Sequence, residues 1–143
     1  RSLTVSAAES LTGGMFQEQL TAISGASTIF KGGIVCYSNE AKQSLLGVKE
    51  KTLSNYGAVS EQCAIEMAEQ IRHIMGADFG LSFTGVAGPD ELEGHPVGTV
   101  FIGLATKVNG TKVIKLSLGK SRQQNRVRSV KNGCSILLRY LKQ

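Results

Sequence analysis

Three side chains in the first third of the chain could together carry out nucleophilic catalysis: Ser10, Tyr37 and Lys42. A serine hydroxyl becomes a nucleophile when a neighbouring base removes its proton, and a neutral lysine amine can be that base. Free lysine titrates at about pH 10.4, so burial or a nearby cation must disfavour its ammonium form. A positively charged substrate would supply the cation, and Tyr37 could relay the proton or orient the amine. Lone lysines and tyrosines are more often surface and core residues, so spacing alone leaves both interpretations open.

Other common catalytic sets are missing from this sequence. Neither His73 nor His95 lies in a loop after a predicted strand together with a suitable partner, so no Ser-His-Asp set is indicated, and two isolated histidines are too few for a metal site. The cysteines Cys36, Cys63 and Cys134 are odd in number and have no short metal-binding spacing. We expect them to be buried free thiols in a reducing cytoplasm.

The stretch Thr4–Gly14 predicts how Ser10 is presented. Its first half is small or β-branched and indicates a buried strand, and Gly13 and Gly14 then permit a sharp turn into a helix. A helix N-terminus carries free N–H donors and the positive end of the helix dipole, which suits an anion or a developing oxyanion. The alternative is that Ser10 or Thr12 only caps the helix. The stretch matches neither the GxxxxGK[ST] phosphate loop nor the GxGxxG dinucleotide fingerprint.

Strands and helices alternate along the rest of the chain. The patterns predict strands over 3–8, 28–37, 78–84, 99–106 and 111–118, and helices over 11–23, 40–46, 49–56, 60–75 and from 121 to the C-terminus. Gly32 and Gly33 inside a strand predict a bulge or a close backbone approach, and Asn109-Gly110 predicts a two-residue hairpin. This order is typical of an α/β layered domain with a mixed sheet.

Three clusters of polar residues and glycines directly follow predicted strands. They are residues 9–14, 37–42 and 84–89. In α/β sheets, ligands bind at the carboxyl ends of the strands. We therefore expect the three clusters to meet and to form one site.

Five sequence blocks give a more specific indication, and they cover nearly the whole chain. They are Ala8-Glu9-Ser10-x-Thr12-Gly13-Gly14, Gly32-Gly33 with Tyr37-Ser38-Asn39-x-x-Lys42, Gly57-Ala58-Val59-Ser60, Thr84-Gly85-x-Ala87-Gly88-Pro89 and Pro96-x-Gly98-Thr99-Val100. In this order they closely resemble the C-terminal domain of the CinA (competence/damage-inducible) proteins. That domain also occurs alone as nicotinamide-nucleotide amidohydrolase, the NMN deamidase. The resemblance implies a three-layer α/β/α fold, a bacterial cytoplasmic location, and hydrolysis of the carboxamide of nicotinamide mononucleotide (NMN) without a cofactor.

The resemblance also implies roles for individual residues. Ser10 matches the proposed nucleophile, Lys42 the general base, and Tyr37 the third catalytic position. The implied substrate-binding residues are Thr12, Gly13 and Gly14, whose amides would stabilise the oxyanion, Thr84 and Gly85 beside the substrate, and Arg122 at the phosphate. The last match is imperfect, because Gly119-Lys120-Ser121-Arg122 has one residue more than the family segment and no aspartate, which makes Arg126 the alternative. Pro89 is followed by Asp-Glu-Leu-Glu where many relatives have glycines, which affects loop shape and substrate range.

Length and charge set the outer limits of the prediction. With 143 residues the chain fits a single domain, 1–143, and its start without methionine suggests a piece of a longer chain or a removed tag. No apolar run is long enough to span a membrane. The net charge is +5, with most of the excess after Lys107, yet no stacking aromatics accompany these charges, so we favour a solvated helix face over nucleic-acid binding. We expect a homo-oligomer acting on NMN; the alternative is a non-catalytic regulatory or partner-binding domain.

Overall fold

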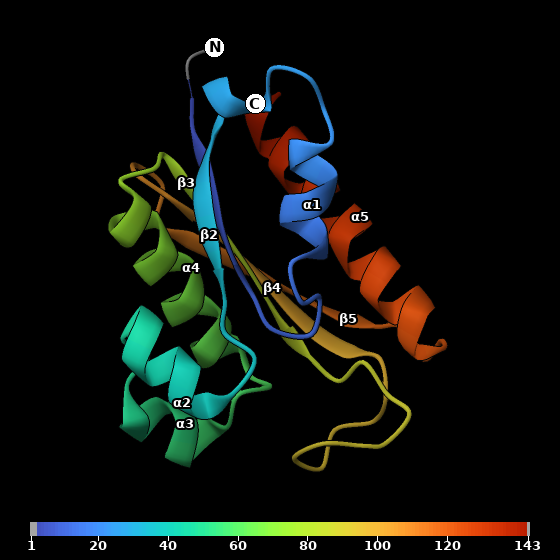
Figure 1. The fold of residues 1–143 in the computed structure, drawn as a ribbon. Helices are drawn as coiled ribbons and strands as arrows, with labels where there is room; N and C mark the ends of the chain where they lie inside the picture. Colours follow the sequence, from blue (N-terminus) through green and yellow to red (C-terminus); the bar gives the residue numbers. More distant parts are fainter. Residues whose placement is uncertain (1–2, 143) are drawn as a thin grey trace.

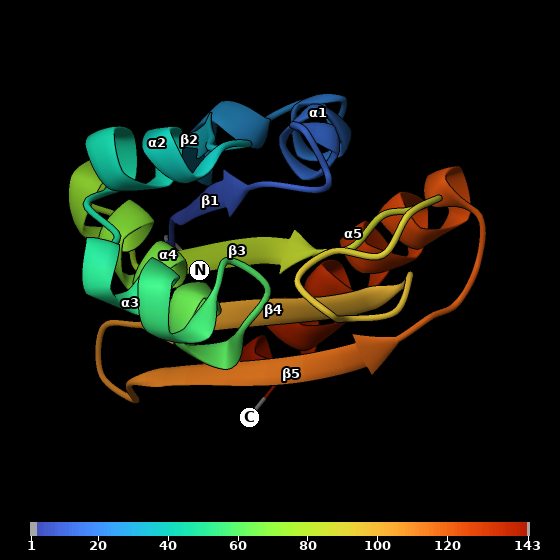
Figure 2. The ribbon, with the colours of Figure 1, turned by 90° about the horizontal axis from the view of Figure 1, so that it is seen from below.

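One mixed sheet of five strands forms the centre of the molecule. The computed structural model describes residues 3–142, and its strands lie in the order β2-β1-β3-β4-β5. They are β1 (Val5–Glu9), β2 (Phe30–Val35), β3 (Phe79–Gly85), β4 (Thr99–Thr106) and β5 (Thr111–Ser117). β1 pairs in parallel with β2 and with β3, whereas β4 pairs antiparallel with β3 and with β5. Figure 2 shows β1, β3, β4 and β5 in this order, and the predicted mixed sheet is confirmed.

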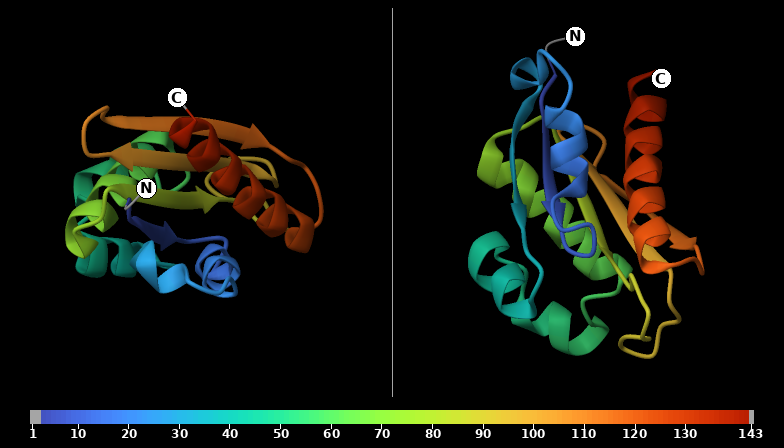
Figure 3. Two further views of the ribbon diagram at one scale, coloured as in Figure 1. Left: turned by 90° about the horizontal axis from the view of Figure 1, so that it is seen from above. Right: turned by 45° about the vertical axis from the view of Figure 1, so that its right-hand side comes forward.

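Helices cover both faces of the sheet. α1 (Met15–Thr21) and α5 (Arg122–Leu141) lie on one face, and α4 (Glu61–Met75) lies on the other with the short helices α2 (Asn39–Ala41) and α3 (Glu50–Tyr56) (Figures 1 and 3). A 3₁₀ turn, η1 (Ala26–Thr28), precedes β2, and a π-helical turn, η2 (Lys42–Leu46), follows α2. The α/β class with three layers is therefore confirmed. None of the helices described within residues 3–142 is long and apolar enough to cross a bilayer.

β1 is enclosed on every side in this arrangement. All five of its residues are buried, because strands pair with it on both sides and helices cover both faces. At its edge with β2 the register shifts beside Gly32, and a Cβ on Gly33 would lie 2.4 Å from the Ala7 carbonyl oxygen. The glycine pair thus marks both a bulge and a close approach, as the sequence predicted.

Several predicted elements differ in their bounds. The strand predicted over 28–37 is shorter, because Thr28 belongs to the 3₁₀ turn and β2 runs only from Phe30 to Val35. The first helix begins at Met15 rather than at Leu11, because Gly13 and Gly14 have φ angles of 58° and 105° and cannot be helical. The helix predicted over 40–46 is a single α-helical turn that widens into a π-helical turn at Lys42. The β4–β5 hairpin is present, but its loop extends over 107–110 and is longer than the predicted two residues.

The carboxyl ends of β1, β2 and β3 meet at one edge of the sheet. The loop between β3 and β4 and the start of α5 reach the same end of the molecule (Figure 2). All three predicted clusters of polar residues and glycines follow one of these strand ends, so they come together as expected.

Candidate active site

Ser10 and Lys42 form a buried pair at this edge. Lys42 Nζ lies 3.1 Å from Ser10 Oγ, and the two side chains are 2% and 8% exposed. The same nitrogen lies 3.0 Å from the carbonyl oxygen of Cys36 and 3.4 Å from that of Tyr37. The three partners of Lys42 Nζ are therefore one hydroxyl and two carbonyl oxygens, and none of them is a carboxylate.

The π-helical turn η2 places Lys42 next to the carboxyl end of β1. Ser38 caps α2 by accepting the N–H of Ala41, and its carbonyl then accepts the N–H of Lys42. At Lys42 the helix widens, and π-helical turns of this kind are frequent at functional sites. Cys36 donates its N–H to the carbonyl of Glu9, which ties the end of β2 to the residue before Ser10. Both partners of the pair are thereby fixed to neighbouring strand ends.

The buried cysteines do not offer a competing nucleophile, whereas Cys134, which was expected to be buried, is exposed on α5. Cys36 and Cys63 are fully buried, and burial raises the pKa of their thiols to about 11 and about 12. A nucleophilic cysteine needs a thiolate, so both are inert near neutral pH. Within residues 3–142 no cluster of His, Cys, Asp and Glu could hold a metal ion.

The turn after β1 is held by Glu9 rather than by a hydroxyl. The buried Glu9 carboxylate accepts the N–H groups of Gly14, Phe16 and Gln17 at 3.2, 3.0 and 3.0 Å. Glu9 therefore caps α1, and neither Ser10 nor Thr12 does so, which answers the alternative left open by the sequence. The Ser10 hydroxyl is left to face Lys42.

Two of the amides expected to bind an oxyanion are already engaged. Gly13 donates its N–H to the Ser10 carbonyl, and Gly14 donates to Glu9. Ser10 itself donates its N–H to the carbonyl of Phe83 on β3. The expectation for Gly13 and Gly14 therefore does not fit the turn as it stands, and Thr12 is the one member of that group whose amide is not bonded to another described residue.

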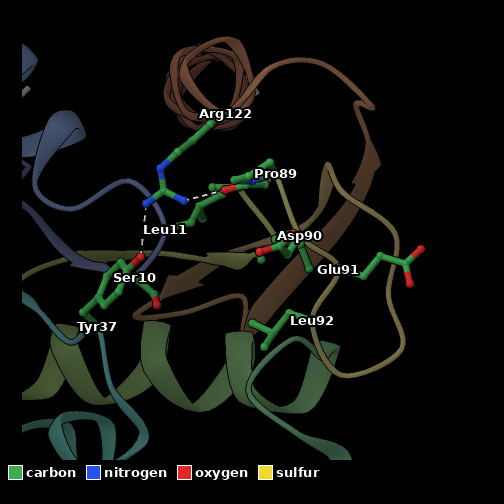
Figure 4. A pocket seen from close by; sticks show the side chains of 12 residues that line it. Ser10, Leu11, Tyr37, Pro89, Asp90, Glu91, Leu92 and Arg122 are labelled. Carbon is green, nitrogen blue, oxygen red and sulfur yellow. Dashed lines mark hydrogen bonds between the residues drawn. The ribbon is translucent and has the colours of Figure 1, made fainter.

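A cavity of about 360 Å³ opens beside this pair. Ser10, Leu11, Tyr37, residues 85–92 and Arg122 line it, so it is formed where the three clusters meet α5 (Figure 4). Its volume is in the range usual for small-molecule sites.

Arg122 and Tyr37 meet at the rim of the cavity. Arg122 donates to the Gly88 carbonyl at 2.6 Å and to the Tyr37 hydroxyl at 3.2 Å, and Figure 4 marks the hydrogen bonds of the Arg122 guanidinium with dashed lines. The Tyr37 side chain is 61% exposed and contacts Arg122 rather than Lys42, so only its carbonyl takes part in orienting the amine.

Comparison with known proteins places this geometry in a family. The family model described as "CinA C-terminal domain" matches residues 1–141. This chain belongs to the CinA C-terminal domain family. A competence-damage inducible protein of Geobacillus sp. (strain WCH70) is 55% identical over 138 residues, which are 96% of this chain and 33% of that protein. One from Bacillus subtilis (strain 168) is 50% identical over 144 residues, 100% of this chain and 34% of that protein. The chain thus spans about a third of the length of these curated relatives.

Solved structures agree with the family assignment. Competence damage-inducible protein A from Klebsiella pneumoniae subsp. pneumoniae MGH 78578 matches with a TM-score of 0.97 and 30% identity, over 100% of this chain and 89% of that one. The competence/damage inducible protein CihA from Agrobacterium tumefaciens matches with a TM-score of 0.94 and 35% identity, over 99% and 87% of the two chains. The resemblance recognised in the sequence is confirmed at the level of family and fold.

Two more residues, Thr84 and Gly85, were expected at the site of this CinA-family domain. Gly85 lines the cavity, and a Cβ there would lie 2.5 Å from the Thr99 carbonyl oxygen, which explains the glycine. Thr84 is buried and donates its hydroxyl to the Ala58 carbonyl at 2.8 Å. Thr84 therefore holds the segment before α4 and does not line the cavity.

The sequence analysis missed two residues that hold the cavity wall. Asn125 is fully buried, and its Nδ2 donates to the Ala87 carbonyl at 2.9 Å, which fixes the loop after β3 to α5. The Glu93 carboxylate accepts the N–H groups of Ala58 and Val59 at 3.0 and 2.9 Å, which anchors the far end of the same loop. The Gly57-Ala58-Val59-Ser60 motif that faces Glu93 was the one available signal.

We expect Glu9→Gln to destabilise the domain by about 2–3 kcal/mol, because an amide has one acceptor oxygen and would turn its NH₂ group toward a backbone N–H. Glu18→Gln is the matched control, since Glu18 is exposed on α1 and its carboxylate accepts a hydrogen bond from Gln19 alone, and it should change stability by less than about 0.5 kcal/mol. Urea unfolding of both variants measures the difference. Equal stability of the two variants would contradict the capping role of Glu9.

Proposed function

We propose that this domain hydrolyses the carboxamide of NMN, releasing nicotinic acid mononucleotide and ammonia. The observation that carries the proposal is the 3.1 Å approach of Lys42 Nζ to Ser10 Oγ, in a buried pair beside a cavity. A lysine buried against a serine hydroxyl and two carbonyl oxygens has little structural purpose, since burying an amine costs stability. The burial of Lys42 is explained if its amine acts as the base for Ser10.

In the proposed reaction Lys42 acts as a neutral amine. Its two N–H bonds can serve the carbonyls of Cys36 and Tyr37, and the lone pair then faces the Ser10 hydroxyl. Ser10 Oγ attacks the carboxamide carbon while its proton passes to Lys42 Nζ. Lys42 then returns this proton to the departing nitrogen, and the C–N bond breaks to give ammonia and an acyl-enzyme ester.

Water completes the reaction by the same route. Lys42 takes a proton from the attacking water, the ester bond to Ser10 breaks, and the proton returns to Ser10 Oγ. The pyridinium ring of NMN assists both steps, because it withdraws electrons from the carboxamide and its positive charge disfavours protonation of a nearby amine.

Measuring ammonia release from NMN with the purified protein tests the proposal directly. Turnover that depends on Ser10 supports it. An inert protein would instead favour the non-catalytic regulatory or partner-binding role, in which the fold is retained without the reaction.

Arg122 is the proposed phosphate-binding residue, since it lines the cavity and Arg126 does not. We expect Arg122→Ala to lower kcat/KM for NMN by about 10- to 100-fold through the loss of a charge-assisted contact. Nicotinamide riboside has no phosphate and should be affected much less. The ratio of the two kcat/KM values on wild type and variant measures this selectivity.

Arg128→Ala is the matched control for Arg122, because Arg128 is exposed on the same helix. An equal loss on NMN and on the riboside would remove Arg122 from the phosphate. It would indicate that the bonds of Arg122 to Gly88 and Tyr37 shape the cavity instead.

A further inference from the structure

The turn that carries Ser10 presents unbonded amides. Ser10 to Gly13 form a β-turn, closed by the N–H of Gly13 on the Ser10 carbonyl at 3.0 Å. In such a turn the N–H groups of the two central residues, here Leu11 and Thr12, take no part in closing it. Neither of them donates to another residue within 3–142.

Unbonded polar groups are unusual at such a buried position. Leu11 is 3% exposed and Thr12 is fully buried, and the Thr12 hydroxyl also has no partner among the described residues. Buried backbone N–H groups are nearly always paired, so a buried turn with two free amides calls for an explanation. The neighbouring amides at Ser10, Gly13 and Gly14 are all paired, which confines the anomaly to these two residues.

Arg126 fixes the orientation of this turn from α5. Its Nε donates to the Leu11 carbonyl at 3.0 Å and its Nη2 donates to the Thr12 carbonyl at 3.1 Å. In a trans peptide the C=O and N–H bonds point in opposite directions. Pulling the Leu11 carbonyl toward α5 therefore turns the Thr12 N–H away from α5. The guanidinium also contacts Gln123 but is not among the groups lining the cavity.

We propose that Arg126 is a positioning residue that orients the Thr12 amide as an oxyanion-hole donor for attack by Ser10, beside the Leu11 amide, which the turn itself holds. The proposal rests on the proposed function, because it assumes a tetrahedral oxyanion at Ser10. Such donors act on the transition state rather than on the bound substrate, so their loss lowers kcat more than it raises KM. The bidentate geometry fits a guanidinium, because its Nε and Nη2 donors are fixed side by side, whereas a lysine ammonium is a single point donor on a flexible stem and would orient the two carbonyls less rigidly.

The test compares Arg126→Met and Arg126→Lys with Arg128→Met, in which an exposed arginine of the same helix is lost. We expect Arg126→Met to lower kcat about 100-fold on both NMN and nicotinamide riboside, with KM changed less than about twofold. Arg126→Lys should fall between Arg126→Met and wild type, and Arg128→Met should match wild type. A KM increase confined to NMN would overturn the proposal, because it would place Arg126 at the phosphate.

A second readout does not depend on NMN. A fluorophosphonate probe phosphonylates an activated serine and directs its phosphonyl oxygen to the oxyanion hole, so Arg126→Met should slow labelling of Ser10 about as much as it lowers kcat. If wild type is labelled but does not hydrolyse NMN, the substrate assignment fails while the role of Arg126 is still decided by the labelling rates. Undiminished labelling in Arg126→Met, or in Arg126→Lys if the methionine variant does not fold, would overturn the proposal.

Discussion

Ser10→Ala is expected to lower ammonia release from NMN by at least about a thousandfold, since removal of a catalytic serine costs this much or more in other serine hydrolases. The fold should survive. Glu9, not Ser10, caps α1, so the substitution removes only the contact between Ser10 Oγ and Lys42 Nζ. A stability loss of about 1 kcal/mol or less is expected from one hydrogen bond.

Ser44→Ala is a suitable control for this variant. Ser44 lies on the same π-helical turn as Lys42, but its hydroxyl is exposed and donates to the Glu40 carbonyl, away from Ser10. It should retain wild-type turnover. If Ser10→Ala also retains near-wild-type turnover after removal of contaminating activity, Ser10 is not the nucleophile.

The assembly of the site could be predicted from the sequence because its parts follow strand ends. A parallel sheet brings the carboxyl ends of β1, β2 and β3 to one edge, whatever the loop conformations are. The meeting of Ser10 with Lys42 follows from this rule and from the motif spacing. The rule says nothing about which backbone amides remain free, since that depends on the φ and ψ angles of individual turn residues such as Gly13 and Gly14.

The role of Glu9 was hidden by its position in the sequence. An acid at the end of a buried strand normally indicates that the strand has reached solvent, whereas Glu9 folds back on three amides of the following helix. A capping residue usually lies directly before its helix, and five residues separate Glu9 from α1. Only the two positive-φ glycines between them make this reach possible.

The sequence alone could not show which arginine of α5 lies at the cavity. Arg122 and Arg126 are four residues apart, so they share one helix face, and either could have met a phosphate. Their contacts differ because α5 crosses two different loops. Arg122 lies against Gly88 at the cavity, while Arg126 lies one turn further along, against the turn after β1.

The final expected result is that Lys42→Met lowers kcat by at least about a thousandfold, comparably to Ser10→Ala, because the two residues act as a unit. Methionine has nearly the length of lysine without its amine. The domain should fold, since removing an amine that is 2% exposed relieves a desolvation cost and offsets the loss of hydrogen bonds to Cys36 and Tyr37. Lys51→Met, an exposed position on α3, is the matched control.

The pH dependence separates a base from a positive charge. Only an unprotonated amine accepts the proton of Ser10, so the wild-type kcat should fall as pH is lowered and recover as pH is raised. The residual activity of Lys42→Met should lack this dependence. Lys42→Arg keeps the charge at a residue that stays protonated throughout, so it should be as inactive as Lys42→Met. Substantial turnover in Lys42→Arg would mean that Lys42 acts as a cation and that a different group accepts the proton.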